Sequence, residues 1–208
     1  MDPILANIFS IIVLVISVVI HEVAHGAVAN SLGDPTAKFA GRLTLNPFKH
    51  LDWFGSLALP LFLVLTTGIG FGYAKPVPIN PFNFRDQKYG MVKVALAGIG
   101  ANLALALVFG LLLRLSLSLT VPVNPNLNDL LAIIVGMNLW LAIFNLMPIP
   151  PLDGSHVLFA FLPRSQEDFK VFLQRYGFIF FLIFIFYFSS IISPIVNFLA
   201  RLIIGGPL

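Results

Sequence analysis

Hydrophobic residues form five long segments along the chain, and polar residues gather in the stretches between them. The segments cover residues 4–28, 54–71, 91–115, 130–162 with interruptions, and 176–204. A helix needs about 20 residues to cross the hydrocarbon core of a bilayer, so every segment except the second is long enough to span. The second is short and contains Pro60 and several glycines, which weaken helices. The pattern predicts an all-α polytopic membrane protein with about four spanning helices, in a single domain of residues 1–208.

The positions of the basic residues distinguish two topologies. If all five segments spanned, the 12 Lys and Arg residues would divide almost evenly between the two sides. If 54–71 is a re-entrant hairpin, only Arg114 and Arg201 lie on the far side and the other ten lie together. The positive-inside rule favours this second arrangement. We therefore expect a re-entrant hairpin and an N-terminus outside the cytoplasm.

Composition supports a membrane location and limits the chemistry. Hydrophobic residues make up 58% of the chain and charged residues 10%, and the mean hydropathy is +0.96. These values are typical of an integral membrane protein. The net charge of +3 reflects a shortage of acids and does not indicate nucleic-acid binding. Because the chain has no cysteine, any bound metal must be held by nitrogen and oxygen ligands.

The first apolar segment ends in a motif with metal-ligand spacing, His21-Glu-Val-Ala-His25. Residues four apart share one face of a helix, so His21 and His25 can bind the same ion. Glu22 stands beside them as a proton acceptor. The motif predicts hydrolytic chemistry inside or at the edge of a bilayer.

The expected topology also indicates a third ligand. The first and fourth spanning helices descend from the same side, and Asp153 is the only acidic residue in the apolar parts of the later helices. It lies in the sequence Asn145-Leu-Met-Pro-Ile-Pro-Pro-Leu-Asp-Gly154 and reaches a depth comparable to that of His21 and His25. Two histidines and one carboxylate leave a fourth tetrahedral position open, as in catalytic zinc sites.

Together, His21 to His25, the sequence from Asn145 to Gly154 and the intervening Gly-Tyr-Ala-Lys-Pro-Val-Pro-Ile-Asn of residues 72–80 resemble the site-2 protease family of intramembrane metalloproteases (peptidase family M50). The resemblance covers roughly residues 4–162 and is strongest to small bacterial or archaeal members, which implies a location in the inner membrane of a prokaryotic cell. No segment is long and polar enough to hold the PDZ or CBS domains of some relatives, so a minimal form is expected. It implies one Zn²⁺ per chain, held by His21, His25 and Asp153, with Glu22 as general base.

The resemblance also implies which residues meet a substrate. The family pattern suggests that Asn145 contacts the substrate or the oxyanion. Residues 75–80 resemble a membrane-associated β element that pairs with the substrate by strand addition, and 41–45 is its expected partner strand. The residues expected to bind substrate in this element are Lys75, Pro76, Val77 and Pro78.

Several positions keep two interpretations. In Gly98-Ile-Gly-Ala-Asn102, Ala97 and Ala101 favour close helix packing, whereas a similar stretch in the family suggests that Asn102 contacts substrate. His156 either supports a metal ligand or is structural. His50 is expected to be solvated or interfacial. Residues 176–204 form one long helix, or a spanning helix followed by a short one after Pro194.

The expected function is zinc-dependent hydrolysis of peptide bonds in or near transmembrane segments of membrane proteins. The expected partners are a transmembrane protein or peptide substrate and the lipid bilayer; assembly into a homo-oligomer stays open, and nucleic acid is not expected. The alternatives are a divalent-metal transporter and an inactive membrane scaffold. Neither requires Glu22 beside three metal ligands.

Overall fold

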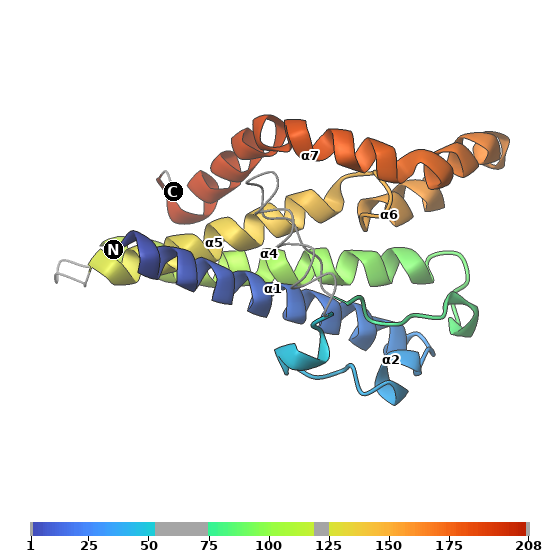
Figure 1. The fold of residues 1–208 in the computed structure, drawn as a ribbon, viewed down its shortest axis with the longest axis horizontal. Coiled ribbons are helices and arrows are strands. Elements are labelled where there is room, and N and C mark those ends of the chain that lie inside the picture. Colours follow the sequence, from blue (N-terminus) through green and yellow to red (C-terminus); the bar gives the residue numbers. More distant parts are fainter. Residues whose placement is uncertain (1, 53–74, 119–124, 207–208) are drawn as a thin grey trace.

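A computed structural model describes residues 2–52, 75–118 and 125–206, and these are helical for most of their length (Figure 1). The predicted hairpin at 54–71 lies outside the described residues. In chain order the elements are α1 (Pro3–Ser31), α2 (Thr36–Phe39), the 3-10 helices η1 (Pro47–Lys49) and η3 (Pro81–Asn83), α4 (Gly90–Ser118), α5 (Pro125–Leu146), α6 (Gly154–Phe161), the 3-10 helix η4 (Arg164–Gln166) and α7 (Glu167–Ile204).

Within the part of the chain that the structure describes, three helices are long and apolar enough to cross a membrane: α1, α4 and the Asn126–Leu146 part of α5. A fourth span is reached if the two parts of α7, Glu167–Ile185 and Ser190–Ile204, are counted together across their 72° bend. Many large side chains on these helices are exposed on the protein surface, among them Ile4, Ile11 and Ile16. Such surfaces suit lipid better than water. The prediction of an all-α polytopic membrane protein is therefore confirmed.

The bend in α7 comes before Pro194, not after it. A proline inside a helix has no N–H to donate and its ring clashes with the carbonyl four residues earlier. For Pro194 that residue is Ser190, where the second part of the helix begins. The distortion therefore falls one turn ahead of the proline. The two interpretations of 176–204 are both partly right, because one continuous helix contains the break.

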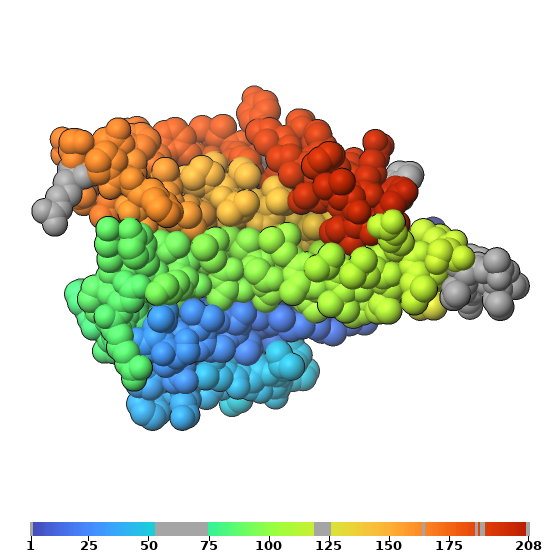
Figure 2. All heavy atoms as spheres, turned by 180° about the vertical axis from the view of Figure 1, so that it is seen from behind, coloured from blue at the N-terminus to red at the C-terminus, as the bar shows by residue number. Residues whose placement is uncertain are grey.

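The helices α1, α4 and α5 pack against one another, and α7 covers α4 and α5. Figure 1 shows α1 and α5 running in the same direction and α4 running against both. Seen from behind, α4 lies between α1 and α7 (Figure 2). The consequence for the site is direct: the C-terminal ends of α1 and α5 lie at the same end of the bundle.

A buried apolar cluster joins α4, α5 and α7 and extends to Leu152, next to Asp153. It contains Val135 and Leu139 of α5 and Ile192 and Val196 of α7. Where α7 meets α4, a Cβ added to Gly110 would overlap the side chain of Ile203. Packing of small against large residues holds these helices close together, which is the main source of helix association when lipid surrounds the bundle.

The segment after the undescribed residues is extended, but the β element predicted for it is not confirmed. The residues that the structure describes contain no β-strand. The backbone N–H of Lys75 donates to the carbonyl of His50 at 2.9 Å, and Nη2 of Arg42 donates to the carbonyl of Lys75 at 2.6 Å. One backbone hydrogen bond to His50 and the side chain of Arg42 thus stand in place of the ladder expected between 41–45 and 75–80. His50 itself is 1% exposed, so the expectation of a solvated or interfacial histidine is wrong.

Asp34 fastens this extended segment to the end of α1. The fully buried carboxylate accepts hydrogen bonds from the backbone N–H of Asn80 at 2.7 Å, from Nδ2 of Asn83 at 2.8 Å and from the hydroxyl of Thr36. Burial raises the pKa of Asp34, but these hydrogen bonds outweigh burial and leave the pKa below its ordinary value. Asp34 is therefore a charged anchor that holds residues 75–83 in place.

Replacing Asp34 with Ala leaves at least three donors unpaired and is expected to destabilise the protein by about 2 to 3 kcal/mol. For a chain of this size, that lowers the midpoint of thermal unfolding by roughly 5 to 10 °C. Glu167→Ala is the control, because Glu167 makes only an exposed ion pair with Lys170 and should change stability by no more than about 0.5 kcal/mol. Equal midpoints for the two variants would contradict the anchor.

The same anchor has a pH dependence with a defined sign. The pKa of Asp34 is lower in the folded than in the unfolded state. The ionised Asp34 carboxylate therefore stabilises the folded protein fully at any pH above the unfolded-state pKa of about 3.9. This stabilisation is lost as the pH falls through the folded-state pKa. The difference in thermal midpoint between wild type and Asp34→Ala should be constant near pH 7 and should narrow as the pH falls below about 3.9.

Candidate active site

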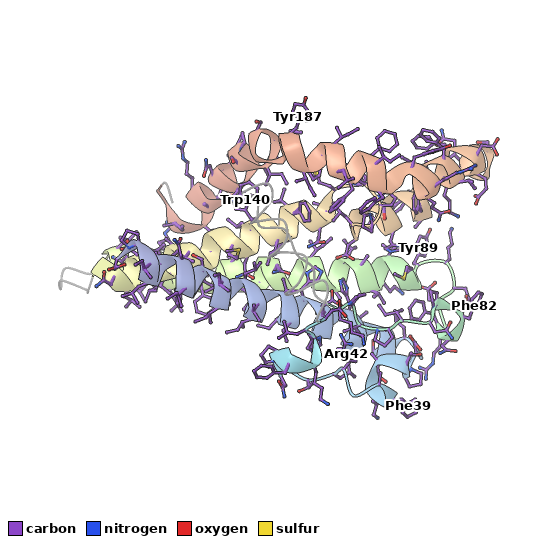
Figure 3. The ribbon with its side chains drawn as sticks, in the orientation of Figure 1. Phe39, Arg42, Phe82, Tyr89, Trp140 and Tyr187 are labelled. Atoms are coloured by element: carbon purple, nitrogen blue, oxygen red, sulfur yellow. The ribbon has the colours of Figure 1, made fainter. Side chains whose placement is uncertain are left out.

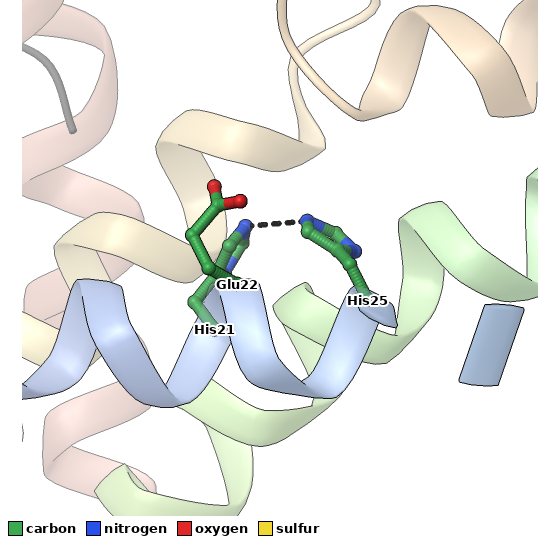
Figure 4. A group of neighbouring side chains, drawn as sticks. All are labelled: His21, Glu22 and His25. Atoms are coloured by element: carbon green, nitrogen blue, oxygen red, sulfur yellow. Dashed lines mark hydrogen bonds between the residues drawn. The ribbon is translucent and has the colours of Figure 1, made fainter. Parts of the chain in front are cut away.

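His21 and His25 lie on one face of α1, one turn apart, and their rings point toward each other (Figure 4). Their Nε2 atoms are 2.9 Å apart. Both residues are buried against α4, which crosses α1 at this level. The predicted pair therefore forms as the helical spacing of four residues requires.

The opposite ring nitrogen of each histidine is engaged in a hydrogen bond. Nδ1 of His25 lies 2.7 Å from the backbone carbonyl of Val94, which can only accept, so Nδ1 carries the proton. Nδ1 of His21 lies 2.6 Å from Oδ1 of Asn102, an oxygen that also accepts. The neutral rings then direct the lone pairs of both Nε2 atoms at the same point.

Asp153, in the segment between α5 and α6, supplies a third donor atom beside the two histidines. Its Oδ2 lies 3.0 Å from Nε2 of His21 and 3.2 Å from Nε2 of His25. The residue follows the break between α5 and α6, where the prolines interrupt the helix. A Cβ on Gly154 would overlap the carbonyl of Leu146 at the end of α5, so this glycine allows the chain to fold back closely enough to bring Asp153 to the histidines.

The donor set fits a small divalent cation. Three lone-pair atoms repel one another when they meet at 2.9 to 3.2 Å with nothing between them, and a cation converts that repulsion into attraction. Ligands about 2.0 to 2.2 Å from a tetrahedral zinc lie roughly 3.3 to 3.6 Å apart, so these atoms need to separate by only a few tenths of an ångström to hold the ion. Nitrogen and carboxylate ligands are also those expected of a chain without cysteine.

Glu22 stands next to the metal-binding atoms without taking the place of Asp153. Its carboxylate belongs to the same group as the histidine nitrogens, within 4.8 Å (Figure 4). Oε2 accepts a hydrogen bond from the backbone N–H of Val77 at 2.7 Å. On the other side of that segment, Arg42, labelled in Figure 3, donates to the carbonyls of Lys75 and Pro76. The extended segment thus holds the carboxylate beside the metal ligands.

Comparison with known proteins identifies the family. The sequence pattern of peptidase family M50 matches residues 122–184. Over 179 residues the chain is 37% identical to "Putative zinc metalloprotease YwhC" of Bacillus subtilis (strain 168), covering 84% of this chain and 78% of that protein. The chain belongs to peptidase family M50. No solved structure matches it. Family membership and the His and carboxylate group make this M50 protein a metallopeptidase.

Close packing in the M50 peptidase is centred on Gly98 of α4, not on Ala97 and Ala101. A Cβ on Gly98 would lie 2.5 Å from Cε1 of His25 and 2.6 Å from Cε1 and Nε2 of His21. Both alanines are only half buried. Close helix packing is therefore correct as an interpretation, but the residue responsible is the glycine against which the two imidazoles lie.

The residues predicted to meet substrate have different outcomes. Asn102 is fully buried and its amide contacts His21 and Asn138, and its contact with substrate stays a prediction. Val77 lies at the site, where its backbone N–H donates to the carboxylate of Glu22. Asn145 lies in the last turn of α5 and donates to the carbonyl of Leu141, four residues earlier. Its contact with substrate stays a prediction, as does the role of His156.

Sequence reasoning missed three contributors: Gly98, the carbonyl of Val94 and Asn138. The first two act through backbone or the absence of a side chain, and a single sequence gives no signal for them. Asn138 did give a signal, because an amide in an apolar helix needs a buried partner.

Gly98→Ala is expected to push the two imidazoles apart and to weaken zinc binding at least about tenfold, the effect typical of disturbing the support of a metal ligand. The matched control is Gly100→Ala, two residues along the same helix, where an added Cβ meets nothing within 4 Å. Zinc affinity measured by competition with a chelator should separate the two variants. Equal affinities would show that the rings do not depend on the glycine.

Proposed function

We propose that this chain is a zinc-dependent intramembrane endopeptidase that hydrolyses peptide bonds in or near transmembrane segments of membrane proteins. The proposal rests chiefly on one observation: Nε2 of His21, Nε2 of His25 and Oδ2 of Asp153 converge within 3.2 Å beside the carboxylate of Glu22. Family membership supports a metalloprotease, and the name of the YwhC relative supports zinc. We assign one Zn²⁺ per chain to these three ligands.

Zinc in this position would supply a Lewis acid for the peptide carbonyl and would lower the pKa of a coordinated water to about 7. Glu22 is the base in the proposed reaction: it accepts a proton from the attacking water and passes it to the leaving amine. The hydrogen bond from Val77 fixes one carboxylate oxygen and leaves the other free for the proton. A half-buried position keeps water near Glu22 while the histidines stay dry.

The direction of the helices supports a site near one face of the membrane. His21 comes 18 residues after Pro3, a rise of about 27 Å at 1.5 Å per residue. Asp153 follows the C-terminal end of α5, which runs parallel to α1 (Figure 1). With the N-terminus outside, as the basic residues favour, the active site lies towards the cytoplasmic side of the proposed inner-membrane location.

We propose that a substrate segment unwinds along residues 75–78, beside Glu22. Pro76 and Pro78 have no N–H, the N–H of Lys75 is bound to His50 and that of Val77 to Glu22. This stretch of backbone has no donor left for a substrate strand. It can accept hydrogen bonds only through carbonyls, so the N–H groups of the unwound substrate are its expected partners. Asn145, at the end of α5, remains the proposed contact on the opposite side.

A transporter or an inactive scaffold has less support. The described residues contain one group of His and carboxylate side chains able to hold a metal. A transport path needs further sites through which the ion can pass, and a scaffold has no use for a carboxylate held at 2.7 Å by a backbone N–H beside three metal ligands.

Glu22→Gln tests the reaction. The amide oxygen of Gln can still accept from Val77, so the variant should keep zinc while cleavage of a single-span model substrate falls by about 100-fold or more. Glu167→Gln, an exposed carboxylate far from the site, is the matched control and should cleave like wild type. A Glu22→Gln variant with wild-type cleavage would refute the role of the base, and retained metal flux in vesicles without cleavage by wild type would favour a transporter.

The proposed orientation can be tested because the natural chain has no cysteine. A single cysteine at Asp2 should react with a membrane-impermeant maleimide added outside intact spheroplasts. One at Lys88, in the exposed turn before α4, should react only after the membrane is opened. The reverse labelling pattern would invert the topology and place the active site on the outer side.

A further inference from the structure

Two asparagines form a polar contact in the middle of the apolar bundle. Asn102 of α4 and Asn138 of α5 are both 0% exposed, and Nδ2 of Asn102 donates to Oδ1 of Asn138 at 3.1 Å. An unpaired amide is costly in a protein interior and more so within a membrane. A pair of apolar side chains would pack here without that cost, so the amides need a reason beyond helix association.

The direction of each hydrogen bond can be traced from one backbone atom. The carbonyl of Ile134 can only accept, so the group of Asn138 that lies 2.9 Å from it is Nδ2. Oδ1 of Asn138 therefore faces Asn102 and accepts from its Nδ2. This leaves Oδ1 of Asn102 facing Nδ1 of His21, which must be the protonated ring nitrogen. The orientation of two amides and the tautomer of one imidazole follow from a single carbonyl.

The two histidines differ in how their tautomers are set. His25 donates directly to the backbone carbonyl of Val94, which cannot rotate. His21 depends on Asn102, whose amide could turn by 180° and present Nδ2 instead. The proton of His21 would then sit on Nε2, where it blocks the lone pair that faces His25 and Asp153. Only Asn138 contacts the Asn102 amide on its other side among the described hydrogen bonds.

We infer that Asn138 is a positioning residue for the metal site: it locks the Asn102 amide in one orientation and thereby keeps Nε2 of His21 unprotonated and available as a ligand. The inference rests on the proposed zinc site and extends it to a helix, α5, that supplies none of the three proposed ligands. Asn138 touches neither metal nor substrate and acts through Asn102 alone.

The experiment compares zinc affinity, by chelator competition in detergent, for wild type, Asn138→Leu, Asn102→Leu and the double variant. Asn138→Leu should lose about tenfold in affinity, at the lower end of the range for residues that orient metal ligands. Because both residues act in one chain of hydrogen bonds, the double variant should bind no more weakly than Asn102→Leu alone. Asn128→Leu is the matched control: Asn128 also joins α5 to α4, through the hydroxyl of Ser116 at 2.7 Å, and should leave affinity unchanged.

A spectroscopic measurement reads the tautomer itself. The chain has four histidines, and ¹⁵N shifts of labelled, zinc-free protein distinguish Nδ1–H from Nε2–H rings. In Asn138→Leu the signals of His21 should shift or broaden while those of His25 stay unchanged. If Asn138→Leu does not fold, Asn138→Ser replaces it. A serine hydroxyl can donate to the carbonyl of Ile134 within the same helix but is too short to reach the amide of Asn102.

The outcomes separate this inference from the zinc site it builds on. Wild type without zinc would overturn both. Zinc in wild type together with unchanged affinity and unchanged His21 signals in Asn138→Leu would overturn the positioning role alone. Additive losses in the double variant, or an equal loss in Asn128→Leu, would show that α4–α5 packing and not the amide relay supports the site.

Discussion

The arrangement of this protein depends on three lone-pair atoms brought together inside an apolar bundle. The Nε2 atoms of His21 and His25 and Oδ2 of Asp153 lie within 3.2 Å of one another, in surroundings where like-directed dipoles are poorly screened. Three other features of the fold bring these atoms together. The parallel course of α1 and α5 brings the ligands to one level, Gly98 makes room for the rings, and Gly154 allows the chain to turn back behind Asp153.

The same principle of satisfied polar groups explains the extended segment beside Glu22. Prolines at 76 and 78 remove two donors, and the remaining N–H groups of this stretch are used by His50 and Glu22. Arg42 in turn donates to carbonyls on the other face of the segment. The segment is therefore a fixed wall of the active site. In the proposed binding mode, a substrate strand would pair only with the carbonyls that this segment leaves open, which would give strand addition a single hydrogen-bonding polarity.

The parts of this protein that could be predicted from sequence are those in which chemistry is carried by rare residue types. Charged and metal-binding side chains are scarce in apolar helices, so His21, Glu22, His25 and Asp153 were visible, and the structure brings them together. The helical spans followed from hydropathy for the same reason. The strand predicted for 75–80 could not be judged in this way, because prolines favour extended backbone whether or not a partner strand exists. Asn102 could not be assigned from the sequence, because an amide looks the same there whether it faces a substrate or supports another side chain.

Polar residues within the bundle differ in meaning according to what lies at the end of their hydrogen bonds. Ser116 and Asn128 join α4 to α5 in one place, and Asn102 and Asn138 join the same helices in another. As helix contacts the two pairs are equivalent, since each satisfies its amide oxygen across the interface. Only the second pair continues to an imidazole whose protonation decides whether a cation can bind. The polarity of a residue in an apolar helix therefore does not reveal its function. The group at the end of its chain of hydrogen bonds does.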